Sequence, residues 1–242
     1  MSFYLRGWYT QALAAQYTFP WLPPVTISDG VYINGNVAVP AIFPGPLMIL
    51  PVSRSITDLG VQSIIDDAHS LGLLEGSGDF TGSGAQPGAK LAQLELIIDG
   101  VKHELTGDPS LSVLCDRGRC TADPGTPQAF TAFWNELGML DLWMPDQLGG
   151  SSQYTPERVA LRLTDPGDLA MFSPAPTIVD WPLATPLASA TCLTLSGTDL
   201  TTMLPILQSA NQLTIFGQGT TYRQPAARAL VPGEPSPCEA AQ

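Results

Sequence analysis

Apolar and polar residues alternate along two pairs of short segments, and each pair is joined by an Asp-Gly dipeptide. Alternation with a period of two indicates strands, and Asp-Gly between two such runs favours a two-residue hairpin turn. The predicted hairpins pair residues 25–28 with 31–34 and residues 94–98 with 101–105.

The turn of the second hairpin, Asp99-Gly100, also determines which residues face each other. Ile98 should lie opposite Val101, and Leu96 opposite His103. This register places His103 in the middle of an apolar face. The other face carries Glu95 opposite Glu104, with Lys102 beside both.

Apolar residues at helical spacing predict three helices. The first is capped by Thr57 and runs to about Leu73. Its apolar face should contain Leu59, Ile64, Ala68 and Leu71. The second begins at Thr126, with Pro127 at the favoured first position. The third opens at Thr198 and contains Pro205, which should either kink the helix or start it afresh.

Further extended runs complete the predicted secondary structure. They span residues 37–43, 47–52, 154–163, 191–195 and 220–231. Pro225 interrupts the last run and favours an edge position for it, because proline cannot donate a ladder hydrogen bond. We expect an α+β fold in which an antiparallel sheet carries three helices, packed mainly on one face, and is stabilised by disulfides.

A Gly/Ser-rich stretch at residues 75–90 interrupts this pattern and reads as a flexible loop. It divides the chain into strands plus a helix at 1–74 and strand–helix segments at 91–242. The stretch is either a domain boundary or an excursion within a domain. We expect 1–74 and 91–242 to form one continuous globular unit. Strands followed by a Thr-capped helix occur three times along the chain. The three segments are only loosely alike, which leaves open whether they form a true repeat.

The charge of the chain narrows its choice of partners. Twenty-two acidic residues against ten basic ones give a formal net charge of −12, with no cluster of Lys or Arg. Such a surface repels phosphate backbones and anionic lipid, so we expect no nucleic-acid partner. No run of apolar residues reaches the length of a transmembrane helix, about 18 to 20 residues.

The four cysteines indicate where the protein folds. They allow three pairings, of which we expect Cys115–Cys120 and Cys192–Cys238; free thiols or a zinc site are the alternatives. Disulfides imply an oxidising compartment. The first ten residues lack the features of a signal peptide, so the chain is either cytosolic or the mature part of an exported protein. The cysteines favour the second, secreted or cell-surface, location.

Several segments together resemble a family of uncharacterised secreted or lipid-anchored bacterial proteins with no assigned activity. They are residues 42–47, 60–62, 176–182, 210–214 and 230–234, followed by Cys238. The resemblance covers most of the chain, from about Val25 onward. It implies export and a Cys192–Cys238 link, and it carries no catalytic residues.

The residues with candidate chemistry are few. His69 follows Asp66 by three positions on the first predicted helix, a spacing that allows a shared face. The simpler interpretation is a solvated helical face. Glu95 and Glu104 face each other, and two such carboxyl groups are the residue types that act as a general acid and a general base. The neighbouring Lys102 offers a structural alternative, since it neutralises their repulsion. We expect no metal and no cofactor.

Apolar residues at 41–50 and just after the second helix are candidates for a contact surface. Phe43, Met48 and Trp143 are the anchors we would expect there if these segments are exposed; burial in strands is the alternative. The sequence therefore favours a non-catalytic extracellular or cell-envelope module that binds a protein, peptide or glycan. The alternative is a hydrolase. Its candidate catalytic carboxylates are Asp66, Asp67, Glu95 and Glu104.

Overall fold

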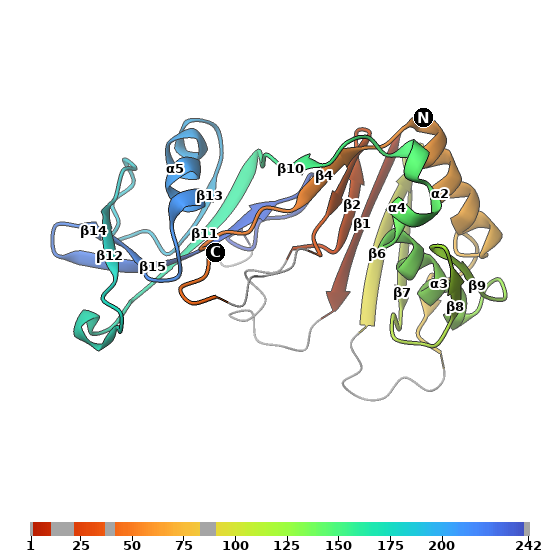
Figure 1. The fold of residues 1–242 in the computed structure, drawn as a ribbon, viewed down its shortest axis with the longest axis horizontal. Coiled ribbons are helices and arrows are strands. Elements are labelled where there is room, and N and C mark those ends of the chain that lie inside the picture. Colours follow the sequence, from red (N-terminus) through yellow and green to blue (C-terminus); the bar gives the residue numbers. More distant parts are fainter. Residues whose placement is uncertain (1, 11–21, 37–41, 83–90, 240–242) are drawn as a thin grey trace. The chain divides into compact units, whose positions relative to one another are not determined.

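The structure, a computed structural model, describes residues 2–10, 22–36, 42–82 and 91–239. The described residues form two compact units, and the fold class is α+β as expected (Figure 1). Unit 1 comprises those within 1–14, 23–36 and 51–154, and unit 2 those within 15–22, 37–50 and 155–242. Strands are therefore divided between two larger sheets, one in each unit.

The division does not follow the Gly/Ser-rich stretch at 75–90. Helix α2 (Asp58–Ser70) precedes this stretch and strand β6 (Leu91–Ile98) follows it, yet both belong to unit 1. Within the stretch, β5 (Asp79–Phe80) pairs with β7 (Val101–Gly107), which keeps it attached to the same sheet. The expectation of a single continuous unit is thus replaced by two units, and the described residues 42–50 belong to the second. Residues 83–90 lie outside the described part.

Unit 1 is built on an eight-stranded sheet in the order β10-β4-β3-β2-β1-β6-β7-β5. The remaining strands of this sheet are β1 (Phe3–Thr10), β2 (Val25–Ser28), β3 (Val31–Asn34), β4 (Val52–Ser55) and β10 (Ser152–Gln153). Both predicted hairpins are present as β2–β3 and β6–β7. The register of the second is confirmed, with His103 opposite Leu96.

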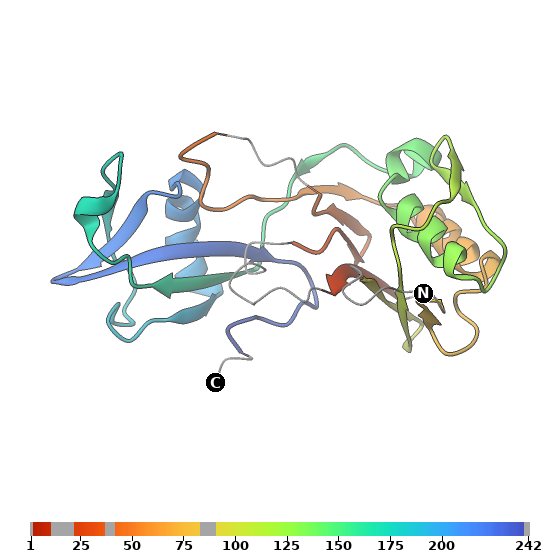
Figure 2. The same ribbon diagram turned by 90° about the horizontal axis from the view of Figure 1, so that it is seen from below.

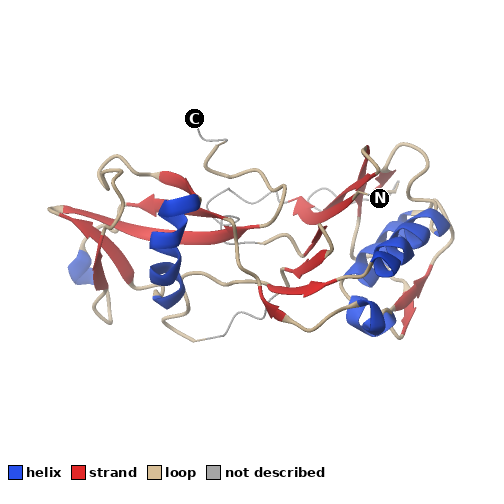
Figure 3. Ribbon diagram, turned by 90° about the horizontal axis from the view of Figure 1, so that it is seen from above, coloured by secondary structure: helices blue, strands red, loops and turns tan. Residues whose placement is uncertain are grey.

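Two longer helices lie on one face of this sheet, α2 and α3 (Pro127–Leu137), and α4 (Leu140–Trp143) follows α3 (Figures 1 and 3). Thr57 and Thr126 cap α2 and α3 through their side chains, as predicted. The core fills the space between helices and sheet. Its largest fully buried members include Leu5, Ile27, Tyr32, Ile64, Leu94, Phe130 and Phe133. Leu59 departs from the expected apolar face, being 71% exposed in the first turn of α2.

A small disulfide hairpin completes unit 1. Strands β8 (Leu114–Asp116) and β9 (Arg119–Thr121) pair directly, and Cys115 and Cys120 lie opposite each other and are bonded. In unit 2 the second disulfide joins Cys192 to Cys238. Both pairs are those expected from the sequence, and none of the described cysteines is free.

Unit 2 is built on a five-stranded sheet in the order β12-β14-β15-β11-β13, which Figure 2 shows with helix α5 (Gly197–Ser209) alongside. Its strands are β11 (Arg158–Thr164), β12 (Thr177–Asp180), β13 (Cys192–Leu195), β14 (Thr214–Gln218) and β15 (Thr221–Leu230). The pairing of β12 with β14 is parallel. Helix α5 runs through Pro205 without starting afresh.

The predicted edge position of the last strand is wrong. β15 lies inside the sheet, between β14 and β11. Pro225 is tolerated because its pairing with β14 ends two residues earlier, at Arg223. On the other side Pro225 faces Leu163, whose own amide is directed to Thr191 in the opposite direction. Its missing N–H therefore costs no ladder hydrogen bond.

The tight contact between β7 and α3 yields a test of this packing. A methyl group added at Gly107 would come within 2.4 Å of the Phe130 ring, whereas one at Gly150 would meet nothing within 4 Å. We expect Gly107→Ala to lower the free energy of unfolding by about 1–3 kcal/mol. Gly150→Ala should change it by less than about 1 kcal/mol. Urea unfolding measures both, and equal effects would contradict the packing described.

Candidate functional site

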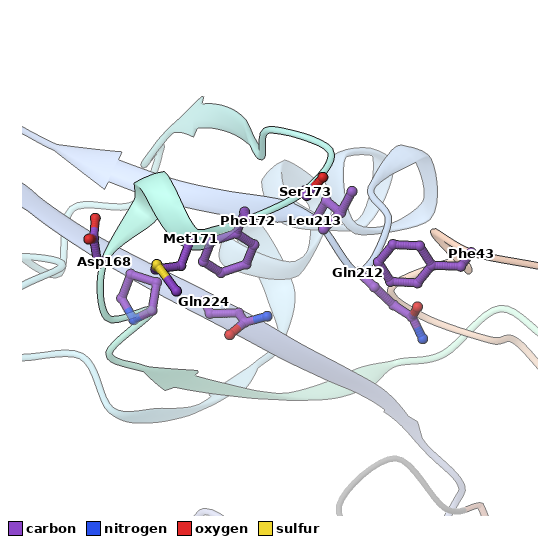
Figure 4. Close-up of a pocket in the computed structure, with 9 residues that line it drawn as sticks. Phe43, Asp168, Met171, Phe172, Ser173, Gln212, Leu213 and Gln224 are labelled. Carbon is purple, nitrogen blue, oxygen red and sulfur yellow. The ribbon is translucent and has the colours of Figure 1, made fainter.

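A groove in unit 2 is the candidate functional site (Figure 4). It encloses a volume of about 470 Å³. Both apolar and polar residues line it. The lining residues are Phe43, Pro166, Asp168, Met171, Phe172, Ser173, Gln212, Leu213 and Gln224. They come from four separate stretches of sequence, so tertiary structure alone brings them together.

Phe43 reaches the groove because its segment pairs with the turn between α5 and β14. The amide of Gln212 donates to the Gly45 carbonyl (2.9 Å), and the amide of Leu47 donates to the Ala210 carbonyl (3.0 Å). The Gln212 side chain closes this pairing by accepting the Gly45 N–H (3.1 Å). Two segments singled out in the sequence, 42–47 and 210–214, thus form one wall of the groove.

The opposite wall is a turn of 3-10 helix at Leu169–Met171. The Asp168 side chain caps this turn by accepting the Ala170 N–H (2.9 Å), which holds Asp168 and Met171 at the rim. Figure 4 shows Met171 and Phe172 next to each other, with Gln224 of β15 below them. Phe43 is 67% exposed and Met171 is 81% exposed. Two large apolar side chains therefore flank the groove in open solvent.

The other two predicted contact residues are placed differently. Met48 is only 5% exposed, so it belongs to the interior and is not available as an anchor. Trp143 lies in unit 1, where its indole N–H donates to the Glu136 carbonyl oxygen (3.0 Å). The Arg119 guanidinium lies 4.5 Å from the centre of its ring. Trp143 therefore supports the hairpin and helices of unit 1.

The predicted histidine and carboxylate candidates do not gather in one site. Asp66 and His69 are both exposed on α2. Asp66 accepts a hydrogen bond from the Gln62 side chain one turn earlier (2.7 Å). His103 is half-buried on β7. This arrangement matches the simpler interpretation of α2 as having a solvated face.

Glu95 and Glu104 do lie opposite each other, as the register predicted. The Lys102 ammonium is 3.1 Å from the Glu95 carboxylate and 2.6 Å from that of Glu104. These hydrogen bonds raise the pKa of Lys102, with the bond to Glu104 the largest cause. Arg6 adds a second positive charge, 3.9 Å from Glu95. Lys102 and Arg6 therefore neutralise the charge of the two glutamates, as the structural alternative predicted.

A different pair of carboxylates is buried. Asp67 of α2 and Glu136 of α3 have side chains that are 3% and 1% exposed. Arg119 of the disulfide hairpin contacts both, at 2.5 Å from Asp67 and 3.3 Å from Glu136. The Cys120 amide donates to the other Glu136 oxygen. We call Asp67 and Glu136 the buried carboxylate pair.

Burial raises the pKa of Glu136 to about 8. A hydrogen bond to Asp67 and the negative charge of that residue act in the same direction, while the Cys120 amide and Arg119 oppose it. Glu136 therefore keeps its proton at neutral pH, because burying a second negative charge next to Asp67 is more costly than binding a proton. Asp67 was a candidate in the sequence and Glu136 was not. The only sequence signal was a glutamate next to the apolar residues Trp134 and Leu137 of the predicted helix.

Two further properties of the described residues bear on function. No group of three or more His, Cys, Asp or Glu side chains among them is arranged to hold a metal ion. None of the helices in the described ranges combines the length and apolar character needed to cross a bilayer.

Comparison with known proteins found no matching family model, no similar curated protein and no similar solved structure.

The raised pKa of Glu136 predicts how stability depends on pH. The unfolded chain releases the Glu136 proton near 4.5, whereas the folded protein keeps it up to about 8. The stabilisation that this proton provides is therefore complete below pH 4.5 and is lost as the pH rises to about 8. Glu136→Gln removes the titration and keeps a hydrogen-bonding side chain. We expect its melting temperature to fall less over this interval than that of the wild type.

Glu104→Gln is the matched control, because the Glu104 side chain is 71% exposed. Its melting temperature should follow the wild-type dependence on pH. A wild-type dependence that survives unchanged in Glu136→Gln would rule out the raised pKa of Glu136.

Proposed function

We propose that this chain is a non-catalytic binding module of the extracellular space or cell envelope. Its ligand, a protein, peptide or glycan, would occupy the groove of unit 2. The observation that carries the proposal is the pair of exposed apolar side chains, Phe43 and Met171, on opposite walls of a cavity that also presents amide, hydroxyl and carboxylate groups. Large exposed apolar groups around a concave surface mark contact sites.

The alternative, a carboxylate-dependent hydrolase, is less well supported by the geometry. The buried carboxylate pair is covered by Arg119, so a substrate has no direct access to it. Lys102 occupies the space between the carboxylates of Glu95 and Glu104. A catalytic pair needs both a perturbed proton affinity and room for the reacting group.

The proposed location rests on the two disulfides, Cys115–Cys120 and Cys192–Cys238. Such bonds form and persist in oxidising compartments. The resemblance to secreted or lipid-anchored bacterial proteins belongs to the same proposal. The Cys192–Cys238 bond also ties the C-terminal segment to β13, which suits a protein that must persist outside the cell.

The groove is tested with a random peptide library and a glycan array. The protein should retain ligands from one of the two collections. Phe43→Ser or Met171→Ser should lower the affinity for these ligands by about tenfold or more, ~1.4 kcal/mol, because each variant removes an apolar anchor. Leu59→Ser is the control, since it removes an equally exposed apolar residue from unit 1. Ligands lost equally in all three variants, or no ligand from either collection, would refute the proposal.

The location is tested in the cell that makes the protein. We expect all four cysteines to resist alkylation in protein denatured without reductant, and to react fully after reduction. Mass spectrometry of the intact chain counts the modified thiols. Reactive thiols in the unreduced sample would argue against an oxidising compartment.

A further inference from the structure

Most edges of the two larger sheets are short or covered. The eight-stranded sheet ends in β10 and β5, each of only two residues. In the five-stranded sheet, the C-terminal segment covers β13: Thr194 donates to Ser236 (2.5 Å), and the Cys238 sulfur lies 3.5 Å from the Leu193 carbonyl oxygen. Proteins protect exposed sheet edges in such ways, since unpaired backbone groups attract other strands.

The edge formed by β12 is different. The amide of Thr177 donates to Leu213 (3.0 Å) and the amide of Trp181 donates to Gly217 (2.9 Å), so alternate residues face β14. The backbone groups of Ile178 and Asp180 therefore point to the other side of the strand. Among the described residues, no strand pairs with that side. Ile178 is also 51% exposed.

The start of β12 lies next to the groove. Leu213, which accepts the Thr177 amide hydrogen, is one of the lining residues, and so is Ser173, four positions before β12. A peptide added along β12 and continued past Thr177 would run toward Ser173 at this end of the groove.

The charges around the edge restrict what can bind. Asp168 is the only charged residue that lines the described groove, and the exposed Asp180 ends β12. Opposite charge in a partner is favoured at such a surface. Pro176 and Pro182 flank β12 and lack an N–H, so the added ladder is confined to the four residues between Pro176 and Trp181. The site thus combines a short open backbone edge, a groove with exposed apolar side chains and negative charge.

From these features we infer that the ligand is an extended peptide with apolar and basic side chains, which adds to β12 as a further strand and places an apolar side chain in the groove between Phe43 and Met171. Backbone hydrogen bonds to Ile178 and Asp180 hold the peptide, and the groove selects its side chains. This inference rests on the proposed function of the groove and names the ligand class for it.

The test uses a synthetic peptide of alternating valine and lysine, titrated against the full chain by fluorescence polarisation. Ile178→Pro removes the outward N–H without removing a hydrogen bond to β14, whereas Ile178→Ala trims the side chain and keeps that N–H. We expect the proline variant to bind the peptide about tenfold more weakly than the alanine variant. Equal binding by the two variants, with folding verified by circular dichroism, would overturn strand addition.

Modified peptides give a second measurement that does not depend on the folding of a variant. N-methylation of alternate amides on one edge of the peptide should abolish binding, and methylation of the other edge should leave it, because only one edge pairs with β12. Identical affinities of the two methylated peptides would contradict the inference. A peptide of alternating valine and glutamate should bind more weakly than the lysine peptide, and Asp168→Asn, which keeps the cap, should reduce that difference.

The outcomes separate the two proposals. Loss of library ligands in Phe43→Ser, with no effect of Ile178→Pro or of peptide methylation, would leave the groove as a binding site and refute strand addition. Failure of the libraries to yield any groove-dependent ligand, together with no binding of the valine–lysine peptide, would refute both.

Discussion

Unit 1 depends on the contact between one half-exposed cation and two buried carboxyl groups. Arg119 of the disulfide hairpin reaches Asp67 on α2 and Glu136 on α3. Burying carboxylates without partners would be costly, and here the proton that Glu136 keeps and the Arg119 guanidinium offset part of that cost. The interaction joins three elements that are distant in sequence. It therefore holds both helices and the hairpin together on the side of the sheet where the core lies.

Unit 2 is held together by different means, and these also shape the groove. The backbone pairing of residues 45–47 with 210–212 attaches a segment from early in the chain to the α5–β14 turn. A buried ion pair between Arg228 and Glu234 (2.7 Å) and the Cys192–Cys238 bond anchor the C-terminal segment. One consequence is a covered edge at β13, and another is an exposed Phe43 beside the groove. Stability and the candidate site therefore arise from the same contacts.

The residues that suggested catalysis in the sequence form contacts with neighbouring side chains in the structure. The residues predicted to contact a partner differ in their exposure. Glu95 and Glu104 are bridged by Lys102, and Asp66 is engaged by Gln62. Phe43 remains exposed, whereas Met48 is buried. The bridged carboxylates belong to unit 1, and the exposed Phe43 belongs to unit 2.

Local patterns in the sequence determined the features that depend on neighbouring residues. Both hairpins, the register of Ile98 with Val101, the caps at Thr57 and Thr126 and the Cys115–Cys120 pair follow from short-range chemistry, whereas the Cys192–Cys238 pair joins residues 46 positions apart. Only the tertiary structure decided the division into two units, the interior position of β15 around Pro225 and the partnership of Asp67 with Glu136. The groove, assembled from four separate stretches, belongs to the same class. Each of these features depends on contacts between segments that are far apart in the sequence. The pattern of polar and apolar residues within one segment does not indicate the strength of such contacts.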